Sequence, residues 1–122
     1  MSAGKTDKRL LGTWRSDRKR TVVDWRFDRR VTPVQRRKFF DIFGRLRLTY
    51  TRTRIRGALP DYEYTLRYEV LASDSDSVAI RYEDRQLGEW RVQHIHFKGR
   101  NRYWIALGQN RDWFRRATDR VG

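Results

Sequence analysis

The chain has 122 residues, of which 38% are hydrophobic and 14% aromatic, and it contains no cysteine. This length suits a single domain with one core, and the lack of cysteine excludes disulfides and thiolate metal sites. The 29 basic and 15 acidic side chains give a formal charge of +14. Counted along the sequence, 18 basic and 5 acidic residues fall in 1–60, against 11 and 10 in 61–122. This asymmetry favours an anionic partner, although an arginine-rich composition can also reflect a genome's base content.

Residues 1–9 are polar and show no periodicity, so we expect a flexible tail before a single domain over residues 10–122. The first residues lack an apolar run of signal-peptide length. No stretch approaches the length of a membrane span. These features predict a cytoplasmic protein.

Residues 10–17 are expected to form the first strand, which carries Trp14 into the core. Residues 21–31 are ambiguous, because a period of two favours a strand while Val22, Val23 and Phe27 also fit one side of a helix. We prefer a short helix there. Thr32, Pro33 and Gln35 form an N-terminal helix signature, and the pattern predicts a helix over 33–43.

From residue 46 onward the hydrophobic period is two, which indicates strands. We expect further strands at 46–50, 62–70, 78–82, 90–98, 102–107 and 111–117. The last three are joined by short links that contain glycine and asparagine, as tight hairpins require. The sequence thus predicts a mainly β fold: an up-and-down antiparallel barrel of about seven to eight strands, with one or two short helices after the first strand.

Gly12 and Trp14 at the start, with Arg115 and Arg116 near the end, resemble the lipocalin signature of the calycin superfamily. The resemblance implies that the tryptophan plugs the closed end of a barrel and that an arginine from the last strand lies across the indole. Helices between the first two strands resemble the intracellular fatty-acid-binding branch, where they form a lid over the open mouth. The chain as a whole resembles small bacterial lipocalin-like domains without an assigned function.

An eight-stranded barrel is just wide enough to be filled by side chains or to hold one small ligand. The aromatic residues can fill it, and we prefer that interpretation, but inward tyrosine hydroxyls can also line a pocket with polar groups. The candidate ligand-binding residues are Tyr50, Tyr64, Tyr68, Tyr82, His94 and His96. The two histidines share one face of a strand, yet their spacing does not demand a metal. We expect no metal and no other cofactor.

The sequence contains no nucleophile motif and no phosphate-binding glycine loop, so we do not expect an enzyme. The first hypothesis is a lipocalin-like protein that binds a small apolar or amphipathic ligand. Its helical segment would present a cationic face to an anionic surface, through Arg26, Arg29, Arg30, Arg36, Arg37 and Lys38. The alternatives are a small basic barrel that binds nucleic acid or another polyanion, and an assembly module without a ligand.

Overall fold

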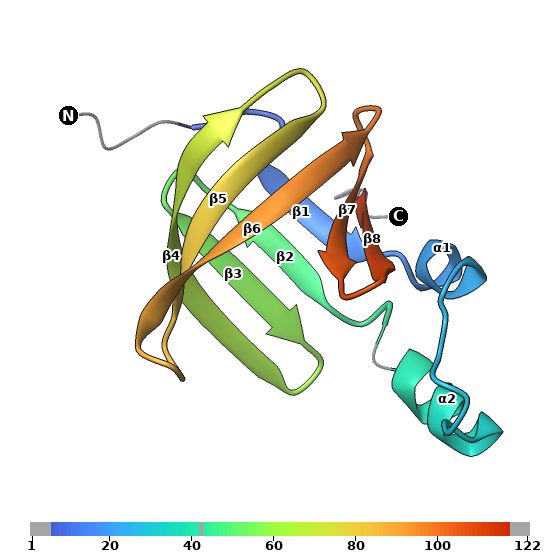
Figure 1. The fold of residues 1–122 in the computed structure, drawn as a ribbon. Coiled ribbons are helices and arrows are strands. Elements are labelled where there is room, and N and C mark those ends of the chain that lie inside the picture. The colour runs from blue at the N-terminus through green and yellow to red at the C-terminus, as the bar shows by residue number, and fades with distance from the viewer. Residues whose placement is uncertain (1–5, 42, 118–122) are drawn as a thin grey trace, which may run out of the picture.

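A computed structural model describes residues 6–41 and 43–117 of the chain as a closed barrel with two short helices (Figure 1). The strands are β1 (Gly12–Ser16), β2 (Arg47–Tyr50), β3 (Arg54–Leu59), β4 (Tyr62–Ser73), β5 (Ser77–Asp84), β6 (Glu89–Lys98), β7 (Arg102–Leu107) and β8 (Asn110–Arg116). Each strand pairs antiparallel with the next, and β8 pairs with β1. The predicted up-and-down barrel is therefore confirmed, with eight strands.

Strand β3 is the element that the sequence pattern did not reveal. Its inward positions are Ile55, Gly57 and Leu59. The glycine is required because a Cβ at position 57 would overlap the ring of Tyr64 on the neighbouring strand β4. A strand with only two apolar residues facing inward, on either side of a glycine, shows little period-two signal.

The helices α1 (Arg18–Val23) and α2 (Pro33–Phe40) both follow β1. The side chain of Asp17 accepts a hydrogen bond from the Arg20 amide at 3.1 Å and so caps α1, and Thr32 with Gln35 forms a capping box on α2. Residues 24–31 belong to neither a helix nor a strand. The expected helix within 21–31 therefore ends at Val23, and the helix expected over 33–43 ends at Phe40.

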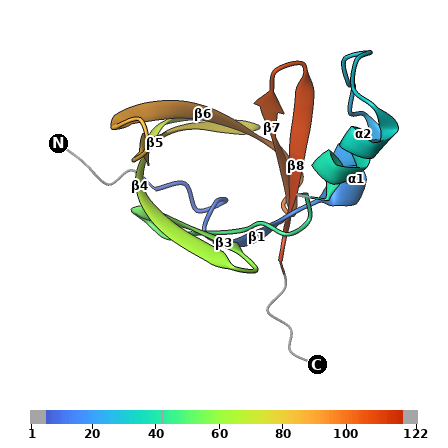
Figure 2. The ribbon, with the colours of Figure 1, turned by 90° about the horizontal axis from the view of Figure 1, so that it is seen from below.

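Residues 18–40, which we call the helical segment, lie beside β8 and do not cover the barrel mouth (Figure 2). Thr21 of α1 accepts a hydrogen bond from the Trp113 amide at 2.9 Å, and Asn110 exchanges two hydrogen bonds with the backbone of Arg26. None of the residues of α2 is buried. Its phenylalanines instead pack with Trp25 and Phe27 in an aromatic cluster outside the barrel. The lid implied by the fatty-acid-binding branch is thus absent from the described residues.

The closed end of the barrel is built around Trp14, which has no exposed surface. Its Nε1 donates to the Leu10 carbonyl at 2.9 Å. The guanidinium of Arg116 lies 4.3 Å from the indole and donates to the carbonyls of Leu11 and Arg9 at 2.9 and 2.8 Å. One side chain therefore holds the indole and the chain segment that leads into β1.

Arg116, and not Arg115, is the arginine that covers the indole. Alternation along β8 places Arg115 on the outer face, opposite Arg15 of β1. Gly12 has a φ of +110°, and a Cβ there would lie 3.2 Å from the Arg116 guanidinium. Glycine at position 12 thus provides both the backbone conformation and the space that this arrangement needs.

The first described residues are attached to the closed end. Asp7 is buried and forms an ion pair with Arg9 at 2.7 Å, and Arg9 also donates to the Ser75 carbonyl at 2.9 Å. Within the tail expected over residues 1–9, Asp7 and Arg9 thus pair with each other, and Arg9 contacts the β4–β5 turn. Residues 1–5 of that tail lie outside the described residues.

Candidate functional site

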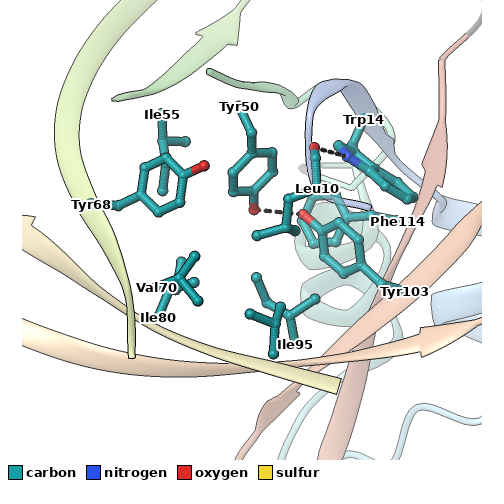
Figure 3. Close-up of a cluster of buried hydrophobic side chains, with 11 residues drawn as sticks. Leu10, Trp14, Tyr50, Ile55, Tyr68, Val70, Ile80, Ile95, Tyr103 and Phe114 are labelled. Atoms are coloured by element: carbon teal, nitrogen blue, oxygen red, sulfur yellow. Dashed lines mark hydrogen bonds between the residues drawn. The ribbon is translucent and has the colours of Figure 1, made fainter. Parts of the chain in front are cut away.

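The barrel interior has two halves, one packed and one hollow. Near the closed end, Leu10, Trp14, Tyr68 and Ile95 pack with almost no exposed surface (Figure 3). Val78 belongs to the same cluster and is fully buried. The opposite end, which we call the mouth, is bordered by the connections after β1, β3, β5 and β7. Toward this end the interior contains a cavity of about 230 Å³. The interior is therefore not completely filled.

The cavity has mainly apolar walls. Its aliphatic and phenyl lining comes from Leu46, Leu48, Ile55, Leu66, Ile80, Ile105 and Phe114, and its polar groups from Tyr50, Tyr64, Tyr82, Tyr103, Gln93 and Asp112. Several of the wall residues are only partly buried, which means that the cavity reaches solvent at the mouth. An apolar pocket with a few convergent polar groups is the usual form of a small-molecule site.

Two tyrosines at the inner end of the cavity bind each other. The hydroxyl oxygens of Tyr50 and Tyr103 are 2.9 Å apart and point toward one another (Figure 3). Burial raises the pKa of both side chains above the ordinary tyrosine value. Both phenols therefore stay neutral near pH 7 and act only as hydrogen-bonding groups.

Asp112 brings a carboxylate into this largely apolar cavity. One of its oxygens, Oδ1, is buried, and no donor among the described residues reaches it. Desolvation raises the pKa of Asp112 to about 6, and a hydrogen bond from Thr21 only partly offsets this shift. At neutral pH the group is still mostly ionised. An unpaired buried charge is costly, and such groups concentrate at functional sites.

A second hollow of about 590 Å³ adjoins the cavity at the mouth and shares Tyr64, Leu66 and Tyr82 with it. It lies where β4 and β5 separate, because their pairing begins only at Tyr68 and Tyr82. The side chains of Tyr64 and Tyr82 thus stand between the outer hollow and the inner cavity. This side of the mouth offers a passage into the barrel.

Of the six candidate ligand-binding residues, the structure brings three together. Tyr50, Tyr64 and Tyr82 line the cavity. Tyr68 also faces inward, but it belongs to the packed half, and its hydroxyl donates to the Thr51 carbonyl.

The two histidines lie on the outer face of β6, because Ile95 between them faces the core. His96 stacks on Trp104 at 4.0 Å, and the guanidinium of Arg111 lies 4.0 Å from the same indole. Both histidines therefore lie outside the barrel, away from the cavity. Among the described residues, no group of three or more metal-binding side chains is positioned to hold an ion.

Sequence reasoning missed Gln93 and Asp112 as cavity residues. Both are polar residues within strands, and the alternating pattern of a half-buried strand normally places polar side chains on the outer face. A signal was available, because Asp112 is two residues before Phe114 and so shares its face. The same parity places Gln93 with Ile95.

The six basic residues predicted for an anionic surface are all exposed on the helical segment. They are not equally available. Arg30 pairs with Asp28 at 3.2 Å, and Arg36 lies over the ring of Phe27 at 5.4 Å. The helical segment therefore presents a loosely organised basic face beside the barrel.

Comparison of the chain with known protein families, curated proteins and solved structures finds no match. The structure itself defines a closed eight-stranded antiparallel barrel with an internal cavity. No described helix has the length and apolar character needed to cross a membrane.

Proposed function

We propose that this chain is a lipocalin-like binding protein without enzymatic activity, and that its barrel holds a small amphipathic molecule. The observation that carries the proposal is the buried, unpaired Oδ1 of Asp112 at the wall of the 230 Å³ cavity. The closed end supports the lipocalin-like assignment, because Trp14 is covered by Arg116 from the last strand. The up-and-down topology agrees with it as well.

The polar groups of the cavity favour a ligand that donates hydrogen bonds. A carboxylate accepts hydrogen bonds and attracts cations, and it repels the carboxylate of a fatty acid. The cavity lining includes no arginine or lysine that would bind such an anion. The ligand therefore has a cationic or strongly donating head directed at Asp112 and an apolar body against the leucine and isoleucine walls.

The cavity volume limits the size of this ligand. An engineered cavity of about 150 Å³ binds benzene. A cavity of about 230 Å³ therefore suits an aromatic ring with a short side chain. Benzylamine is a matching probe, benzyl alcohol is its neutral counterpart, and phenylacetate is an anionic one.

Calorimetric titration of the three probes at pH 7.5 tests the proposal. We expect benzylamine to bind best and phenylacetate worst. Asp112→Asn should weaken benzylamine binding by about tenfold to a hundredfold, since one charge-assisted hydrogen bond is lost. Benzyl alcohol should change by much less. Asp76→Asn, in the exposed β4–β5 turn, makes the same chemical change far from the cavity and should leave all three affinities unchanged.

The pH dependence of binding adds a second criterion. Asp112 is the group that titrates near pH 6 in the cavity, and burial raises the pKa of Tyr50, Tyr64 and Tyr103 further above their ordinary value. Benzylamine affinity should fall as the pH drops through about 6, and benzyl alcohol affinity should not. Equal binding of all three probes, or no heat from any of them, would contradict the proposed function.

A further inference from the structure

Five basic side chains form a row across the outer face of the barrel wall. Arg15 of β1 is directly opposite Arg47 of β2 on one side and Arg115 of β8 on the other. Arg102 of β7 is opposite both Arg115 and Lys98 of β6. Since adjacent strands are about 4.8 Å apart, this cation row extends about 19 Å along the surface.

The cation row is almost free of counter-charges. Among the described residues, no carboxylate lies within 4.0 Å of Arg15, Arg47, Lys98 or Arg115. Arg102 is 4.0 Å from Asp17. Like charges placed directly opposite each other destabilise a sheet. Five in succession therefore oppose folding unless an anion neutralises them.

A hollow of about 510 Å³ is centred on the middle of the cation row. Arg15, Arg102 and Arg115 line it from the strands. The segments beside β1 and β2 add Arg18, Lys19 and Arg45, while the acidic residues in the lining are Asp17 and Asp41. Asp41 is paired with Arg18 at 3.5 Å. The hollow thus keeps a strong excess of positive charge.

We propose that the cation row binds the phosphodiester chain of a single-stranded nucleic acid. A linear polymer with regularly repeated negative charge complements a linear row of cations. The row crosses five of the eight strands, so it follows the convex wall of the barrel. Duplex DNA, with a persistence length of about 50 nm, and a flat bilayer would each touch only part of it, whereas a flexible single strand can follow the curve.

A second row, of planar side chains, lies beside the cation row. His96, Trp104 and Trp113 are directly opposite one another on β6, β7 and β8, two residues along the strands from Lys98, Arg102 and Arg115. Trp104 is only partly buried. Trp113 is buried, with the Arg20 guanidinium 4.6 Å from its ring, and the ring of Trp104 is in contact with His96 and Arg111. His96 and Trp104 are thus the members of the row that reach the surface. Aromatic side chains beside a positive track for phosphates are common in single-strand-binding proteins. This neighbourhood favours a nucleic acid over a polyanion without bases.

Fluorescence anisotropy with a labelled dT15 oligonucleotide tests the inference. We expect binding whose logarithmic salt dependence has a slope of about −3.5 for five phosphate contacts. The double variant Arg47→Gln/Arg115→Gln should lose about tenfold or more in affinity at 100 mM NaCl and reduce that slope by about 1.4. Neither arginine makes an ion pair with a described residue, so the variant should fold normally; circular dichroism checks this.

Arg29→Gln/Arg37→Gln is the matched control, because it removes the same charge from the exposed face of the helical segment. It should change the affinity by less than about threefold. An equal loss in both variants would overturn the assignment to the cation row.

Tighter binding of a 15-bp duplex, of anionic vesicles or of inorganic polyphosphate than of dT15 would overturn the assignment to a single strand. Asp112→Asn should leave dT15 binding intact, so this inference and the proposed function fail independently.

Discussion

The two ends of the barrel are built from the same eight strands, yet they are stabilised very differently. At the closed end, Leu10 and Trp14 are fully buried, and every polar group of the indole and its covering arginine has a partner. At the mouth, the interior contains a cavity and a buried carboxylate oxygen without a donor. The closed end therefore contributes stability, while the mouth keeps features that reduce it. Features that reduce stability and persist are expected where a protein binds its ligand.

The largest expected effect concerns the closed end. Trp14→Ala removes a fully buried indole and leaves a cavity beneath the guanidinium of Arg116. The free energy of unfolding should fall by about 3–5 kcal/mol, as measured by urea denaturation. Trp90→Ala is the control, since Trp90 lies on the outer face and is 39% exposed. It should cost only about 1 kcal/mol, from lost contacts with Arg81. Similar losses in both variants would mean that Trp14 is not the plug of the barrel.

The next effect has the opposite sign and concerns the mouth. Asp112→Asn should raise the free energy of unfolding at pH 7.5 by up to about 3 kcal/mol, because a desolvated charge is removed. The pKa of Asp112 is about 6 in the folded protein and near 3.8 when unfolded. Below pH 4 the carboxyl is protonated in both states and costs little. Between about pH 4 and 6 the unfolded chain ionises this carboxyl while the folded protein keeps it protonated, so stability is lost over this range and the loss is complete above about pH 6.

The difference in unfolding free energy between wild type and Asp112→Asn therefore isolates this group. It should be small at pH 4, grow up to about pH 6 and then stay constant. Asp7, Asp28, Asp74 and Glu83 have lowered pKa values, so acid acts on them in the opposite direction. Their contribution is shared by both proteins and cancels. A difference that does not change with pH would show that Asp112 is hydrated and not part of a dry site.

The same two ends show what the sequence could and could not predict. The closed end follows from local signals: Gly12, Trp14 and an arginine near the end of the chain identify it, and alternation predicts most of the strands. Which arginine covers the indole depends on which face of β8 turns inward, and the adjacent aromatic residues Trp113 and Phe114 leave that choice open in the sequence. Strand β3 was missed because its central inward residue is a glycine. Position 57 requires glycine because the ring of Tyr64 on β4 occupies the space of a side chain there.

The candidate site was harder to predict for the same reason. That Asp112 shares a face with Phe114 follows from local spacing. The energetic cost of burying its carboxylate arises only when the other seven strands close the barrel and exclude water. The cation row is less visible still, since its five members come from five strands that span residues 15 to 115. Composition indicated an excess of arginine and placed it in the first half of the chain. Only the register shows that arginines of both halves meet.

Gly57→Ala tests the boundary between the packed and hollow halves. The new methyl group would overlap the ring of Tyr64, which must then move within the cavity. We expect a loss of about 1–3 kcal/mol from overpacking, measured by thermal and chemical unfolding. The double variant Gly57→Ala/Tyr64→Leu should recover most of this loss, because the smaller side chain removes the overlap. If the double variant is no more stable than the single one, the cost lies in the backbone and not in the contact with Tyr64.

The smallest effect compares two neighbouring arginines. Arg116→Gln removes the contact with Trp14 and hydrogen bonds to two carbonyls, and it should cost about 1–2 kcal/mol. Arg115→Gln removes the same charge from the outer face, where its cross-strand neighbours are Arg15 and Arg102. It should leave stability unchanged or raise it by a few tenths of a kcal/mol, because repulsion is relieved.

Unfolding at low and high salt separates the two variants, since salt screens only the repulsion between exposed charges. The gain from Arg115→Gln should vanish at 1 M NaCl, whereas most of the loss from Arg116→Gln should remain. A loss from Arg115→Gln as large as that from Arg116→Gln would mean that the cation row stabilises the barrel, and the argument that it is retained to bind an anion would then fail.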